Sequence, residues 1–259
     1  MRLNKSFYQL ALSILRNRVK RALHRFLPPN HVDTFLRTLT QEGSVIAGSV
    51  ATSIVAPEIM NEPPRNLNVI VPFRPRYEKW LTVLKQMGFD FDQADVKRRN
   101  QRYSDMCYIA RSPYSEKPIV VLWAASVSPL LPLLASRYTY EMNFMTADYV
   151  YCIYPRLTLR RETFERPRVG NDEATHGTGA VSVIDPTSMT GPCEIYCPME
   201  LRSTRQAKGI AMVPWATVDY TTTGHGFFKD QTLVYRVHSW CRNPHCHRAR
   251  ETYIPSHLL

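Results

Sequence analysis

Apolar residues recur at two different spacings along the chain. In residues 6–27 and 31–41 they repeat every three or four positions, which is typical of amphipathic helices, and Gly43 follows as a C-terminal cap. Beyond it, short apolar runs alternate with helical patterns, which predicts an α/β fold with a sheet flanked by helices. The expected elements are a strand at 44–47, a short helix after Gly48, a strand at 66–72, a helix at 76–87, strands at 103–110 and 118–124, a helix at 129–136 and a strand at 149–154.

The character of the chain changes after residue 160. Residues 161–175 are charged and contain glycine, which is typical of a linker or a long loop. Residues 176–259 are rich in β-formers, proline, threonine and aromatic residues, so they predict a β-rich C-terminal extension. We therefore expect an N-terminal helical segment at 1–42, a core at 43–160, the linker, and this extension.

Positive charge is concentrated in the first helical segment. The chain has a net charge of +11, and its first 32 residues contain seven basic residues and no acidic one. Three interpretations stay open, because each produces the same pattern of charge and hydrophobicity. The segment is a structural helix that packs its apolar stripe on the core, a mitochondrial-type presequence, or a helix that contacts phosphate backbones or anionic lipid.

Residues 118–136 form an uncharged run of nineteen residues. Pro118, Pro129 and Pro132 interrupt it, so we expect a buried strand and a short helix rather than a transmembrane segment. No secretory signal pattern is present, and six cysteines in that context predict free thiols in a reducing compartment. We therefore expect a cytoplasmic or nuclear protein, with mitochondria left open by the presequence interpretation.

A glycine–serine turn and the strand that follows it form the most informative motif. Gly48-Ser49 connects a strand to a helix, an arrangement in which the backbone can approach a phosphate. The next strand begins Asn66-Leu67-Asn68, and the alternation of side chains along a strand places both asparagines on one face. Acidic residues at these two positions would hold Mg²⁺ against a nucleotide phosphate.

This combination resembles the nucleotidyltransferase superfamily, which has the polymerase-beta-like fold. The sequences GSVATSIVAPE and NLNVIVP, together with residues 142–159, are also similar to a group of proteins from mushroom-forming fungi. The resemblance implies a nucleotidyltransferase-like mixed sheet flanked by helices, with Gly48 and Ser49 as nucleotide-binding residues. It also implies that Asn66 and Asn68 stand where the family has its first two metal-binding acids.

The chain departs from the family pattern at the residues that perform catalysis. A neutral amide lacks the charge that binds Mg²⁺ and activates a hydroxyl group. The third carboxylate of such a site would belong on a later neighbouring strand, here 117–124, but no acidic residue occurs between Glu116 and Glu141. We therefore expect a catalytically degenerate member of the fold that does not use Mg²⁺.

Four other acids could in principle form a relocated active site. We interpret them instead as exposed acids in loops, because loops usually carry solvated charge. They are Glu58, Glu62, Asp90 and Asp92.

The extension holds four of the six cysteines in two pairs, Cys193-x₃-Cys197 and Cys241-x₄-Cys246. Zinc takes four thiolate or imidazole ligands, usually from two such knuckles, and His238, His245 and His247 lie close to the second pair. These spacings are wider than the usual C-x₂-C. The pattern therefore leaves two interpretations open, a zinc site and free thiols in a β-rich region.

Three functional hypotheses follow. The first is a degenerate binding or scaffold module, with residual contact to nucleotides or RNA through Gly48, Ser49 and nearby basic residues. The second is an active nucleotidyltransferase with relocated acids. The third is a zinc-stabilised interaction protein, in which the extension meets a protein partner.

Overall fold

The structure of the chain is a computed structural model. It describes residues 4–72, 74–92, 104–124, 128–166, 180–193, 197–203, 209–216, 233–238 and 240–249. Among these residues, no helix is long and apolar enough to cross a membrane.

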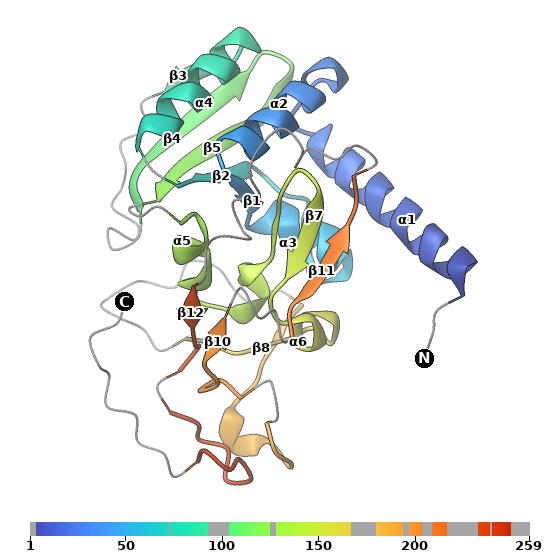
Figure 1. The fold of residues 1–259 in the computed structure, drawn as a ribbon, viewed down its shortest axis with the longest axis vertical. Helices are drawn as coiled ribbons and strands as arrows, with labels where there is room; N and C mark the ends of the chain where they lie inside the picture. Colours follow the sequence, from blue (N-terminus) through green and yellow to red (C-terminus); the bar gives the residue numbers. More distant parts are fainter. Residues whose placement is uncertain are drawn as a thin grey trace.

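An eight-stranded mixed sheet forms the centre of the molecule, in the order β11-β7-β6-β1-β2-β5-β4-β3. Its neighbouring strands are antiparallel except for β2 and β5, which run parallel. Figure 1 shows the sheet with helices around it. The strands are β1 (Val45–Ala47), β2 (Leu67–Val71), β3 (Asp90–Asp92), β4 (Ser104–Ser112), β5 (Ser115–Ala124), β6 (Phe144–Met145), β7 (Tyr149–Cys152) and β11 (Ala211–Pro214).

The helices follow the sequence-based expectation closely, and the predicted α/β fold with a mixed sheet flanked by helices is confirmed. The 3₁₀ turns η1 (Pro57–Ile59), η2 (Thr139–Met142) and η3 (Pro186–Ser188) add short connections. The α-helices are α1 (Lys5–Leu23), α2 (Pro29–Gln41), α3 (Ser49–Val55), α4 (Arg74–Gln86), α5 (Leu130–Leu134) and α6 (Pro155–Leu159).

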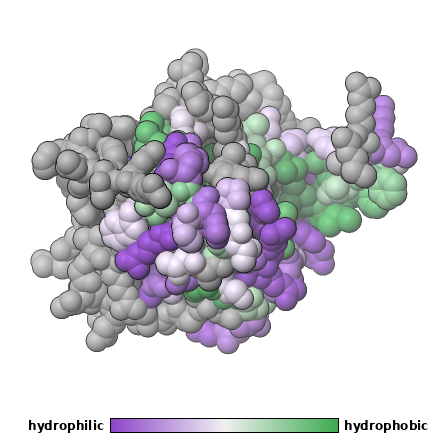
Figure 2. Space-filling model, turned by 90° about the horizontal axis from the view of Figure 1, so that it is seen from below, coloured by the Kyte–Doolittle hydropathy of each residue, from purple (hydrophilic) through white to green (hydrophobic). Residues whose placement is uncertain are grey.

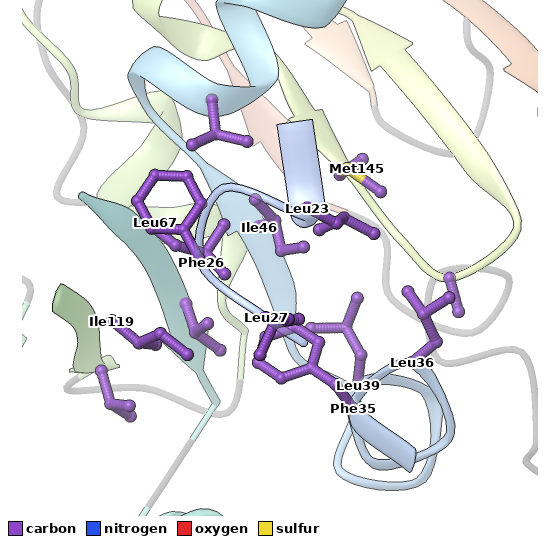
Figure 3. Packing of buried hydrophobic residues seen from close by; sticks show 14 of the residues in the cluster. Leu23, Phe26, Leu27, Phe35, Leu36, Leu39, Ile46, Leu67, Ile119 and Met145 are labelled. Carbon is purple, nitrogen blue, oxygen red and sulfur yellow. The ribbon is translucent and has the colours of Figure 1, made fainter. Parts of the chain in front are cut away.

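Two hydrophobic clusters use side chains that alternate along the strands. In β2, Leu67 and Val69 pack in a cluster with α1 and α2, while Ile70 packs in a second cluster with α5. Figure 3 shows the first cluster, where Leu23 and Phe26 approach Ile46 and Leu67. Period-2 alternation of the strand therefore assigns odd-numbered residues of β2 to one face and even-numbered residues to the other.

Helix α1 is divided between a packed half and an exposed half. Its second half buries Val19 and Leu23, and Phe26 and Leu27 just beyond it are also buried in the first cluster. Arg16 Nε donates a hydrogen bond to the carbonyl oxygen of Trp215 at 2.9 Å. The second half of α1 is thus a structural part of the core, as the first interpretation of this segment expected, whereas residues 4–11 are exposed.

The C-terminal extension contributes to the main sheet and also forms two small sheets. Its strand β11 pairs with β7 at one end of the main sheet. Strand β8 (Glu162–Thr163) pairs parallel with β9 (Ser182–Val183), and β10 (Arg202–Ser203) pairs antiparallel with β12 (Val234–Tyr235). The expected linker at 161–175 therefore begins with a short strand rather than a loop, and its residues 167–175 lie outside the described part.

Candidate metal centre

The turn after β1 brings together the residues expected to form a nucleotide site. Gly48 has a backbone φ of +71°, and it precedes Ser49, the first residue of α3. A Cβ atom at Gly48 would lie 2.7 Å from Asn68 Nδ2, so only glycine allows this close approach. Asn66 Nδ2 in turn donates a hydrogen bond to Asn68 Oδ1. The two half-buried amides thus lie on one face and satisfy each other beside the turn.

Strand β5 offers this face no acidic neighbour. Asn68 is in register with Val120 across the parallel β2–β5 pair, and β5 carries its single acid, Glu116, near its start. Strand β5 therefore brings no carboxylate beside the two amides.

The four alternative acids do not gather near the amides. Glu58 and Glu62 are exposed, and Glu62 forms an ion pair with Arg65. Asp90 and Asp92 do not lie in a loop as expected, because they form strand β3, which pairs with β4 at the far edge of the sheet. Strands β5 and β4 lie between β2 and β3. Three ordinary strand spacings put the Cα atoms of Asp92 and Asn68 about 14 Å apart.

The four cysteines of the extension converge on one point. Their sulfur atoms all lie within 4.8 Å of one another, and all four residues are buried. Cys193 Sγ and Cys241 Sγ are 3.6 Å apart, as are Cys197 Sγ and Cys246 Sγ. Within the described residues, this is the one group of three or more histidine, cysteine or acidic side chains that could share a metal ion.

Strands β10 and β12 explain why residues so distant in sequence meet. Arg202 is in register with Tyr235, and the two strands are antiparallel. The chain just before β10 therefore lies beside the chain just after β12, where the N–H groups of Val237 and His238 bond the carbonyl of Pro198 at 3.0 and 2.9 Å. Cys197 is one residue before Pro198, so this ladder places the first pair of cysteines opposite the second.

Hydrogen-bond donors surround the sulfur atoms in a repeated pattern. Three sulfurs accept from the backbone N–H two residues later, in the pairs Cys197–Met199, Cys241–Asn243 and Cys246–Arg248. The fourth, Cys193 Sγ, accepts from the side-chain Nδ2 of buried Asn243 at 3.0 Å. Donors aimed at sulfur stabilise the thiolate, which is the form that binds metal.

Burial works against the charged form in the same cluster. It raises the pKa values of Cys193, Cys197 and Cys241 above that of a free thiol. Burial also acts to raise the pKa of Cys246, but the N–H of Arg248 and hydrogen bonds from the other thiols outweigh it and the pKa is lowered. A bound cation would remove the cost of burying thiolates, because metal coordination deprotonates a thiol outright.

The nearby histidines lie outside the cluster. His245 and His247 are exposed, and the ring of half-buried His238 interacts with the backbone of Glu165. The sequence pattern did not single out Asn243. Its backbone N–H donates to Cys241 Sγ, and its side chain donates to Cys193 Sγ. Asn243 also donates to the carbonyl of Gly191 at 2.8 Å, so one side chain joins the two pairs of cysteines.

No family model, curated protein or solved structure matches the chain. Tetrahedral zinc with Zn–S bonds of about 2.3 Å separates its sulfur ligands by about 3.8 Å. The sulfur separations here, from 3.6 Å up to the 4.8 Å limit, bracket that value. A disulfide would instead need sulfurs about 2.05 Å apart, and all six cysteines are free thiols. The cluster could bind zinc.

Proposed function

We propose that this chain is a non-catalytic binding protein whose C-terminal extension is held by a structural zinc ion at Cys193, Cys197, Cys241 and Cys246. The observation that carries the proposal is the convergence of these four buried sulfurs, each with an N–H donor. A site with four protein ligands has no open position for water or substrate, which is typical of structural rather than catalytic zinc. The metal would order the extension for contact with a protein partner.

The rest of the proposal is that the main domain is a degenerate nucleotidyltransferase fold. It is supported by the Gly48 turn and by Asn66 and Asn68 on one face, at the positions that the family resemblance assigns to metal-binding acids. Two amides that bond each other offer Mg²⁺ little, since it prefers carboxylate and phosphate oxygens. Residual contact with a nucleotide or RNA at Gly48 and Ser49 would then serve binding and not transfer. We place the protein in the cytoplasm or nucleus, where thiols stay reduced.

Metal analysis of the purified full-length protein tests the zinc site. We expect about one zinc per chain, because the four ligands complete one tetrahedron. The Cys241→Ser variant should lose it. Cys107→Ser is the matched control, because Cys107 lies on β4 outside the cluster. This variant should keep its full zinc content. Zinc-free protein that is nevertheless folded, or full zinc in Cys241→Ser, would contradict the proposal.

Label transfer tests the absence of catalysis. The protein is incubated with each α-labelled nucleoside triphosphate, with Mg²⁺ or Mn²⁺, and with itself, RNA or a cell extract as acceptor. We expect no incorporation above a heat-inactivated control. Transfer that is abolished by Gly48→Trp would instead support the active alternative, and would direct the search to Glu58, Glu62, Asp90 and Asp92.

A further inference from the structure

The outer half of α1 exposes a line of large hydrophobic side chains. Phe7, Leu10 and Ile14 are 64%, 57% and 45% exposed, and their spacing of three and four residues places them on one face of the helix. Tyr8, four residues before the buried Leu12 and so on the other side of the helix, is 42% exposed. Figure 2, seen from below, shows hydrophobic surface at its right-hand end, where Figure 1 places the start of α1.

This face is different from the one that α1 packs on the core. The buried residues Leu12, Val19 and Leu23 follow one another at intervals of seven and four, and form a separate stripe. Continued toward the body of the protein, the exposed face carries Arg21, seven residues after Ile14 and also exposed. The exposed face is thus apolar at its outer end and basic where it approaches the core.

We propose that this face of α1 docks on an anionic lipid bilayer. Phe7, Leu10 and Ile14 would enter the boundary between headgroups and acyl chains, and Arg21 would meet the headgroups. The ten residues Lys5–Ile14 extend over about 15 Å, enough to lie along the surface of a bilayer. The absence of acids from the first 32 residues, against seven basic ones, gives the charge complementarity that an anionic surface requires.

The arrangement suits lipid better than a nucleic acid or a second copy of the chain. A phosphate backbone would be met by several cations along this face, but Phe7, Leu10 and Ile14 occupy its outer part and its basic end is Arg21. Two α1 helices packed in parallel through this face would bring their Arg21 side chains together, and an antiparallel pair would place each Arg21 against the apolar end of the other helix, both of which are unfavourable. A bilayer accepts apolar side chains and attracts basic ones, and so matches both ends of the face.

Vesicle flotation of the full-length protein tests this docking. We expect the protein to float with vesicles of phosphatidylcholine and phosphatidylserine, and to float much less with phosphatidylcholine alone or at high salt. The variant Phe7→Ser/Leu10→Ser/Ile14→Ser should reduce the bound fraction about tenfold, because it removes the inserting side chains. Arg21→Glu should reduce it by a smaller factor, about threefold.

A matched variant separates this face from general surface hydrophobicity. Leu159, Leu201 and Val183 are 61%, 59% and 46% exposed elsewhere on the molecule, so the triple change of these residues to serine should bind vesicles like the unchanged protein. Circular dichroism and zinc content report whether each variant is folded.

Three outcomes would overturn the proposal. The first is absence of flotation, or flotation that the triple change at Phe7, Leu10 and Ile14 leaves intact. The second is a shift of single-stranded RNA, without vesicle binding, that this variant removes, since it would assign the face to nucleic acid. The third is a dimer in light scattering that the variant dissociates, again without vesicle binding, since the face would then bind a second copy.

Discussion

The turn at Gly48 and the cysteine cluster differ in the chemistry of the side chains that each brings together. The turn joins residues close in sequence, and the side chains that meet beside it are the neutral amides of Asn66 and Asn68. The cluster joins residues about fifty positions apart and has a complete set of soft ligands. Backbone geometry and ligand chemistry are therefore separate properties, and a functional assignment needs both.

The two sites also differ in whether the polar groups of each are stabilised by hydrogen bonds within the site alone. The Asn66 amide donates to Asn68, so this pair is stable as it stands. The four cysteine sulfurs are buried within 4.8 Å of one another, with several N–H donors around them that stabilise negative charge. Four thiolates in that space require a cation.

Removing the metal should destabilise the zinc-loaded protein more than any change at the turn. We expect a strong chelator to lower the melting temperature by about 10 °C or more, because the ion joins the two cysteine pairs of the extension. Differential scanning calorimetry with and without chelator measures the change. The chelator should leave the melting temperature of Cys241→Ser unaltered, and an equal drop in that variant would contradict a metal bound at the cluster.

The pH dependence of zinc retention follows from the same chemistry. Burial raises the pKa values of Cys193, Cys197 and Cys241 when no metal is bound, so zinc must displace protons to bind. Zinc affinity is therefore full at alkaline pH and falls as the pH is lowered, when protons compete for the sulfurs. Chelator competition at about pH 8 and about pH 6 should show faster zinc loss at the lower value.

Asn243→Ala should weaken zinc binding without abolishing it. The change removes the donor to Cys193 Sγ and the bond to the Gly191 carbonyl, while all four sulfur ligands remain. Supporting contacts of this kind are worth about 10- to 100-fold in metal affinity. Competition with a zinc-binding dye measures the affinity. Unchanged affinity would mean that Asn243 only packs beside the site.

Gly48→Ala should lower the free energy of unfolding by about 1–2 kcal/mol and leave zinc content unchanged. The new Cβ meets Asn68 Nδ2 at 2.7 Å, and the backbone φ of +71° is strained for alanine. Denaturant unfolding measures the loss of free energy. Adding Asn68→Ala to the Gly48→Ala variant should restore the part of that free energy that is lost through the clash with the Asn68 side chain. Gly191→Ala is the control, because its Cβ meets nothing within 4 Å.

The double change Asn66→Asp/Asn68→Asp should have the smallest effect, a loss of about 0.5–1 kcal/mol from repulsion between like charges. The loss should disappear as the pH falls through the carboxyl pKa values, and Mg²⁺ should reverse part of it at neutral pH. Label transfer should stay absent, because β5 still lacks an acid beside this face. Asn68→Asp alone keeps the acceptor for Asn66 and should be nearly neutral.

The local elements could be predicted from the sequence, because local patterning fixes them. The alternation at Asn66, Leu67 and Asn68 predicted a strand with both amides on one face; β2 begins one residue later, at Leu67, and the two amides hydrogen-bond each other. The edge strand β3 could not be predicted in the same way. It is three residues long and is formed by pairing with β4, a contact that local propensity does not record.

The cysteine cluster was only half predictable. The two pairs of cysteines indicated zinc, but their spacing left free thiols as an alternative. What brings the pairs together is the β10–β12 ladder, and each of those strands has only two residues. The role of Asn243 depends on that convergence, so it became visible only in three dimensions.

The contact between Trp215 and α1 joins an early segment of the chain to a late one. It is buried with α1 in the main core, and its carbonyl receives the hydrogen bond from Arg16 across 199 positions of the chain. During synthesis the first helix leaves the ribosome long before this partner exists. This part of the core, with the pairing of β11 on the edge of β7, can therefore form only after residue 215 has emerged.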